Sequence, residues 1–112
     1  MSSPGKLTPE QEKDVQRYYE LRQSLDSIRI NIQQYEIMKH DSSNALKVVD
    51  ELDNSTVIYR STGPILFQSD VETVKKSLTD ELERIEVHLS SLQKREKNIL
   101  NSLKEIQERL KI

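Results

Sequence analysis

The chain has 112 residues, of which 32% are charged and 34% belong to the hydrophobic set, with only two glycines and three prolines. One domain's worth of chain with so little apolar material favours long, solvated helices over a compact core. The net charge is −2 and positive and negative residues are interspersed, which predicts no general attraction to nucleic acid. The absence of cysteine excludes disulfide and thiolate chemistry, and no run approaches the roughly 18 apolar residues of a membrane span.

The first expected element is a helix over about residues 8–53, after a flexible N-terminal stretch over residues 1–7. The first six residues lack the apolar core of a signal peptide, so we expect a cytoplasmic protein. Thr8 and Gln11 are spaced as a capping box, with Pro9 at the first helical position. Apolar residues then recur in alternating steps of three and four, which is typical of a coiled-coil seam. They are Tyr18, Leu21, Leu25, Ile28, Ile32, Tyr35, Leu46 and Val49.

The seam of this helix is interrupted in the middle. Lys39 and Ser42 take two of its positions, and short polar side chains at residues 41–44 compete for the backbone. We expect the helix to continue through this segment, with a local break as the alternative.

A β-hairpin is expected over about residues 55–68. Val57-Ile58-Tyr59 and Ile65-Leu66-Phe67 have strand composition, and a Ser-Thr-Gly-Pro turn separates them. Gly63 can take the positive φ of a tight reversal, and Pro64 is tolerated at the start of the returning strand.

This hairpin alone cannot pair its outer strand edges or cover its apolar faces. Two strands alone are marginal in water, both edges are open, and alternation places apolar side chains on both faces. Because no other strand is expected in the chain, the missing strands must come from other chains and could close into a shared β-barrel. A plain connector between helices, the alternative, would not need six large apolar residues. The predicted assembly contacts are Val57, Ile58, Tyr59, Ile65, Leu66 and Phe67.

A second helix is expected over about residues 70–111. Ser69 or Asp70 caps it, with Glu72 placed for a capping box on Ser69. We also expect ion pairs within the helix, of Asp80 with Arg84 and of Glu105 with Arg109. Its seam, interrupted only by Glu96, consists of Leu78, Leu82, Ile85, Leu89, Leu92, Ile99, Leu103, Ile106 and Leu110.

The predicted fold is therefore mainly α. Two helices joined by a short reversal lie antiparallel with their seams facing, so residues 8–112 form a single domain, a long two-helix coiled coil joined by one β-hairpin.

Catalysis is not expected. His40 and His88 fall off the seams without a companion at metal-ligand spacing, and Gly5 and Gly63 make no phosphate loop. The basic cluster at residues 94–97 contains its own counter-charge and reads as a solvated face. We predict no catalytic, cofactor-binding or metal-binding residues, no cofactor, and neither nucleic acid nor membrane as a partner.

Apolar residues also gather near both ends of the chain, where long helices fray. Leu7, Tyr19 and Ile112 lie off the seams, so packing does not explain them. Tyr18, Leu103, Ile106 and Leu110 lie on the seams, and packing between the two helices explains them equally well, so that alternative stays open. The residues expected to present apolar surface at these ends are Leu7, Val15, Tyr18, Tyr19, Leu103, Ile106, Leu110 and Ile112.

The hairpin sequence, hydrophobic-Tyr-Arg-x-x-Gly-Pro-hydrophobic, with the seam over residues 46–52 before it and leucine heptads after it, resembles the beta-class subunit of prefoldin over nearly the whole chain. One hairpin marks the beta class, since alpha-class subunits carry two. The resemblance implies a hetero-hexamer of two alpha-class and four beta-class subunits, with the hairpins assembled into a double β-barrel. It also implies an ATP-independent holdase whose coiled-coil tips capture non-native polypeptides and deliver them to a group II chaperonin. By this resemblance, the apolar residues named above near the two chain ends would be the client- and chaperonin-binding residues.

Two other classes of function remain as alternatives. The chain could be a coiled-coil scaffold or adaptor that docks one specific folded partner, similar to a tubulin-binding cofactor, or an arm of an enzyme. A stable monomer would favour the adaptor, because a helical adaptor needs no strands.

Overall fold

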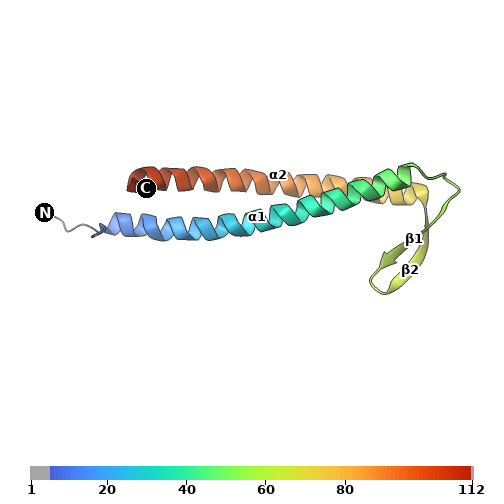
Figure 1. The fold of residues 1–112 in the computed structure, drawn as a ribbon, viewed down its shortest axis with the longest axis horizontal. Helices are drawn as coiled ribbons and strands as arrows, with labels where there is room; N and C mark the ends of the chain where they lie inside the picture. Colours follow the sequence, from blue (N-terminus) through green and yellow to red (C-terminus); the bar gives the residue numbers. More distant parts are fainter. Residues whose placement is uncertain (1–5, 112) are drawn as a thin grey trace. The chain divides into compact units, whose positions relative to one another are not determined.

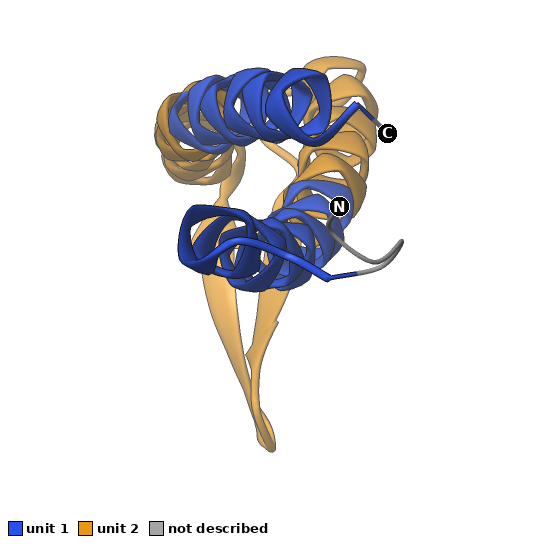
Figure 2. Cartoon of the chain, turned by 90° about the vertical axis from the view of Figure 1, so that its left-hand side faces the viewer, with its two compact units in different colours: residues 1–33, 91–112 blue, residues 34–90 orange. Residues whose placement is uncertain are grey.

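The computed structural model describes residues 6–111 and confirms the predicted class of fold. In chain order the elements are α1 (Pro9–Asp50), β1 (Val57–Thr62), β2 (Ile65–Asp70) and α2 (Val71–Leu110), so two long helices flank a β-hairpin (Figure 1). The chain divides into two compact units, with residues 1–33 and 91–112 in unit 1 and residues 34–90 in unit 2 (Figure 2).

Helix α1 begins with the predicted capping box. The backbone N–H of Thr8 donates to Gln11 Oε1 at 2.9 Å, and the N–H of Gln11 donates to Thr8 Oγ1 at 3.1 Å. These two bonds satisfy N–H groups that have no partner inside the helix. The capping-box prediction is therefore confirmed.

Helix α1 continues unbroken through residues 39–44, and Ser42 occupies its seam position as a buried residue. The helix ends at Asp50, before the expected residue 53, because its last turn tightens. The N–H groups of Glu51 and Leu52 bond to carbonyls only three residues back, at 3.3 and 3.1 Å.

Unit 1 pairs the first part of α1 with the last part of α2 in antiparallel fashion. Its core uses the predicted seam positions Leu25, Ile28, Leu92, Leu103 and Ile106. Glu96, the charged residue that interrupts the seam of α2, accepts a hydrogen bond from Arg29 Nε at 3.1 Å. The interruption is thus a cross-helix ion pair.

Unit 2 pairs the remaining parts of the two helices and carries the hairpin. Its core is Val49, Val71, Val74 and Leu78, with Leu46, Leu52 and Ile58 packed around it. Lys39, which interrupts the seam of α1, forms an ion pair with Glu86 of α2. A second cross-helix pair joins Lys75 to Asp50, at 3.5 Å.

The hairpin is a two-stranded antiparallel sheet closed by Gly63 and Pro64. Gly63 has φ 58°, the left-handed conformation predicted for it. The loop is shorter than the expected four-residue turn, because pairing continues to Thr62 opposite Ile65, and Pro64 precedes the returning strand. This register offsets the two apolar runs, so the first run, residues 57–59, faces the polar residues 68–70.

Strand β2 leads directly into helix α2, and Asp70 is the junction. Its carboxylate accepts hydrogen bonds from the backbone N–H and the hydroxyl of Thr73, both at 2.8 Å. Ser69 lies within the strand. Of the two residues predicted to cap α2, Asp70 is therefore the cap, and the capping box of Ser69 with Glu72 is wrong.

Candidate assembly and client-binding surfaces

The register of the hairpin sorts its apolar residues into two faces. Side chains of directly paired residues lie on the same face of a sheet, and successive residues alternate. The pairs Ile58 with Ser69 and Thr62 with Ile65 define one face, and Tyr59 with Gln68 defines the other. The first face therefore carries Ile58, Ile65 and Phe67, and the second carries Val57, Tyr59 and Leu66.

The first face is anchored to the helices of unit 2 at its base. Ile58 is half-buried and packs against the core around Val71 and Val74. Arg60 Nη1, on the same face, donates a hydrogen bond to Ser77 Oγ of α2 at 3.1 Å. These contacts hold the strands against α2 and leave the loop end of the hairpin without cover.

Five of the six predicted assembly residues are solvent-exposed. The exposed fractions are 53% for Val57, 66% for Tyr59, 62% for Ile65, 70% for Leu66 and 44% for Phe67. Full burial of one such side chain contributes about 1.5–3 kcal/mol. A two-stranded sheet with this much uncovered apolar surface on both faces has the composition of an interface.

The second predicted surface lies in unit 1, where the first turns of α1 meet the last turns of α2. The structure divides its residues by exposure. Leu7 and Tyr19 are exposed, at 44% and 65%, whereas Leu103 and Ile106 are buried, at 4% and 1%. Val15, Tyr18 and Leu110 are half-buried, and Ile112 lies outside the described residues. Of the predicted set, the surface available on the closed helix pair is therefore mainly that of Leu7 and Tyr19.

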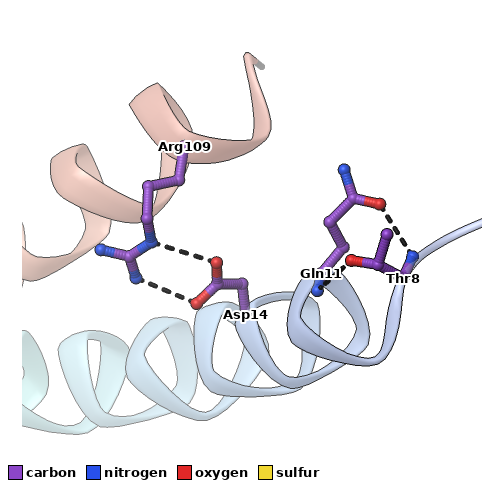
Figure 3. A network of polar contacts seen from close by, with 4 residues as sticks. All are labelled: Thr8, Gln11, Asp14 and Arg109. Atoms are coloured by element: carbon purple, nitrogen blue, oxygen red, sulfur yellow. Dashed lines mark hydrogen bonds and ion pairs between the residues drawn. The ribbon is translucent and has the colours of Figure 1, made fainter.

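Polar contacts connect the two helices at this end. Arg109 donates to both carboxylate oxygens of Asp14, from Nε at 3.1 Å and from Nη2 at 2.9 Å (Figure 3). The hydrogen bond from Arg109 holds the pKa of Asp14 below its ordinary value, and the same bond raises the pKa of Arg109. The direct ion pair of Arg109 reaches across to α1, while Glu105, its predicted partner on α2, acts as a nearby negative charge that also raises the pKa of Arg109.

Each histidine contacts a neighbouring side chain on α1, a tyrosine ring in one case and an asparagine amide in the other. His88 stacks on Tyr35 with ring centroids 5.1 Å apart, and His40 Nδ1 lies 3.3 Å from Asn44 Nδ2. Residues 6–111 contain no cluster of three or more His, Cys, Asp or Glu side chains that could hold a metal. Over the same residues, neither helix has an apolar stretch sufficient to cross a membrane.

Comparison with known proteins decides the family. The family model described as "Prefoldin subunit" matches residues 12–112. The chain belongs to the prefoldin subunit family. The resemblance predicted from the hairpin is thus confirmed, and the chain is a member of a chaperone family.

Named relatives of this prefoldin-family chain are beta subunits. Prefoldin subunit beta of Archaeoglobus fulgidus is 29% identical over 106 residues, which cover 95% of this chain and 91% of that protein. Prefoldin subunit beta of Methanothrix thermoacetophila is 22% identical over 107 residues, which cover 96% of this chain and 89% of the relative.

Solved structures agree in fold. The crystal structure of the prefoldin beta subunit from Thermococcus strain KS-1 superimposes with a TM-score of 0.86 at 20% identity, covering 93% of this chain and 91% of that one. The beta2 subunit of the same strain gives a TM-score of 0.73 at 24% identity, with coverages of 81% and 97%.

Three features of these surfaces were not predicted. Val71 and Val74 lie seven and four residues before Leu78, spacings that place all three on one helix face, so helical periodicity could have placed these valines in the core. The bond of Arg60 to Ser77 and the pairing of Asp14 with Arg109 join residues far apart in sequence, and no local pattern indicates them.

Proposed function

We propose that this prefoldin-family chain is a beta-class subunit of a cytoplasmic hetero-hexamer of two alpha-class and four beta-class subunits. In this proposal the hexamer is an ATP-independent holdase that captures non-native polypeptides and delivers them to a group II chaperonin. The carrying observation is the hairpin, in which five large apolar side chains are exposed on a sheet of only two strands among residues 6–111.

Assembly through the hairpin follows from its open edges and uncovered faces. Backbone N–H and C=O groups on the outer edges of β1 and β2 can pair with strands of neighbouring subunits, and closure of several hairpins into a barrel removes the edges. Val57, Tyr59, Ile65, Leu66 and Phe67 supply the apolar contacts, while Ile58 keeps the hairpin on its own helices.

Client capture is assigned to the end of unit 1. Leu7 and Tyr19 offer exposed apolar surface, and Val15, Tyr18 and Leu110 add half-buried surface beside them. Leu103 and Ile106 contribute when this end of the helix pair opens, and Ile112 belongs to the same proposed set. Small patches of this kind bind weakly singly, so several subunits acting together provide holding by multivalency and still allow release.

The proposal is tested by preparing the chain with an alpha-class subunit and measuring light scattering from a refolding client without nucleotide. The complex should suppress aggregation, and Tyr19→Ser should weaken suppression without changing the mass of the complex. Val48→Ser is the matched control, because Val48 is 61% exposed on α1 and lies in unit 2. Absence of suppression by the wild-type complex would count decisively against holdase action.

Light scattering on the chain also separates this proposal from the adaptor alternative. A single folded chain that stays monomeric together with an alpha-class subunit would favour an adaptor. A multi-subunit complex would favour the chaperone.

A further inference from the structure

One ion pair closes the end of unit 1 at which α1 begins and α2 ends. Arg109 holds Asp14 through two hydrogen bonds, of 3.1 and 2.9 Å, in the side-by-side geometry that gives arginine–carboxylate pairs their strength (Figure 3). The two side chains are 22% and 54% exposed, Asp14 being the more covered. The two residues are distant in sequence, so this contact exists only while the helices are paired at this end.

Little else that is polar holds this end together. The next ion pair between the helical segments of unit 1 within residues 6–111 joins Arg29 to Glu96. It lies about 22 Å further along α1, at 1.5 Å per residue. Between the two pairs, Gln107 Nε2 donates to the hydroxyl of Tyr18 at 3.4 Å, which is a long bond. The end is therefore closed by one ion pair and by apolar packing.

That packing covers two fully apolar side chains. Ile106 and Leu103 are 1% and 4% exposed, whereas Tyr19, on the neighbouring surface of α1, is 65% exposed and meets the ring of Tyr18 edge-on at 6.0 Å. Opening the helices at this end would join the buried residues to the exposed tyrosine in one apolar surface.

We propose that the pair of Asp14 and Arg109 is a latch that limits exposure of this surface. The latch is an autoinhibitory contact: while it is formed, Leu103 and Ile106 belong to the core, and when it breaks they become available to a non-native polypeptide. The opening itself is independent of the proposed function, but its consequence for a client rests on that function.

A single surface ion pair can govern this equilibrium because the ends of paired helices open at low free-energy cost. An exposed but well-formed arginine–carboxylate pair then changes the open population by about two- to five-fold. The direction in which salt changes the opening distinguishes the ion pair from apolar packing. Screening weakens the ion pair, whereas it does not weaken the burial of Leu103 and Ile106, so opening at this end should increase with salt.

The test is amide hydrogen exchange of the full chain, read by mass spectrometry on peptides covering residues 103–110. Asp14→Asn and Arg109→Gln should each accelerate exchange there about two- to five-fold. The double variant should exchange no faster than the singles, because either substitution already removes the contact. Raising the salt concentration should accelerate exchange in the wild type and leave the double variant unchanged.

Glu86→Gln is the matched control, because it removes the ion pair with Lys39 in unit 2. It should leave exchange of residues 103–110 at the wild-type rate. Unchanged exchange in both single variants, additive effects in the double variant, or an equal effect of Glu86→Gln would each overturn the latch.

Suppression of client aggregation by the assembled complex is measured on the same variants. Stronger suppression per complex together with faster exchange supports the latch as a gate for clients. Faster exchange with unchanged suppression, in a complex whose wild type does suppress, overturns the gating role. A wild-type complex that suppresses nothing overturns the proposed holdase function, and exchange then decides the latch by itself.

Discussion

Replacing Leu66 with alanine should weaken assembly and leave the single chain folded. Leu66 is 70% exposed near the loop end of the hairpin and lies on the face that also carries Val57 and Tyr59. Its truncation leaves no cavity in the single chain, so the stability of the folded chain should change by less than about 0.5 kcal/mol.

The effect on assembly can be estimated from the exposed fraction. Fully burying a leucine side chain contributes about 1.5–3 kcal/mol. Because 70% of Leu66 remains to be buried, an interface that covers it gains about 1–2 kcal/mol, a large part of which alanine loses. That loss corresponds to about 5- to 30-fold in the dissociation constant of each contact.

The assay is light scattering during size-exclusion chromatography, over a dilution series and with an alpha-class subunit present. Val87→Ala is the matched control, because Val87 is also 70% exposed but lies on the surface of α2. Leu66→Ala should dissociate at higher concentration than the wild type, and Val87→Ala should not. Equal behaviour of the two variants would refute the reasoning, since exposure alone would then carry no information about the interface.

Three further predictions concern the single chain. Ile106→Ala should reduce the free energy of unfolding by about 2–5 kcal/mol in urea denaturation, against less than about 1 kcal/mol for the 42%-exposed Leu100→Ala; equal losses would contradict the packing described. Gly63→Ala should destabilise the hairpin by about 1–2 kcal/mol, because φ at this position is 58°, a left-handed conformation that alanine disfavours. The added methyl group meets nothing within 4 Å, so no new contact offsets this cost. Gly63→Asn should cost less, and faster amide exchange over residues 57–70 for alanine alone would verify this. The backbone N–H of Thr73, and after it the Thr73 hydroxyl, hold the pKa of Asp70 below its ordinary value by hydrogen bonding to its carboxylate. The stability that ionised Asp70 adds to the fold is therefore complete above about pH 4 and is lost as the pH falls through the lowered pKa. Asp70→Asn should therefore flatten the acid limb of the melting temperature against pH, and an unchanged limb would contradict the cap.

The class of fold could be predicted because it depends on local patterns. The alternating three- and four-residue spacing identifies the helix faces, and the Gly63 turn between two apolar runs identifies the hairpin. The capping box of Thr8 with Gln11 is equally local, since both partners lie within one turn.

Contacts between the helices could not be predicted in the same way. Lys39 and Glu96 read as defects of the seams, yet each pairs with a charge on the opposite helix, Glu86 and Arg29 respectively. Recognising this requires the register of one helix against the other, which periodicity within a single helix does not provide. The same reason applies to Arg109, whose direct ion pair is with Asp14 on the opposite helix.

The candidate surfaces were predictable in composition and less so in accessibility. For Leu103 and Ile106 near the end of α2 the sequence leaves two interpretations, availability where the helix end frays or closure of the coil, and their burial at 4% and 1% agrees with closure in the paired state. Tyr19, which lies off the seam, is exposed as its position indicates. Off-seam position was thus the better indicator of exposed apolar surface than nearness to the chain end.

The most direct test of the account is the native mass of the complex that this chain forms with an alpha-class subunit, measured together with amide exchange of residues 57–70. The account predicts a mass of six chains and strong protection of the hairpin that is lost on dissociation. A folded monomer that remains alone beside the alpha-class subunit, with rapidly exchanging hairpin amides, would contradict it.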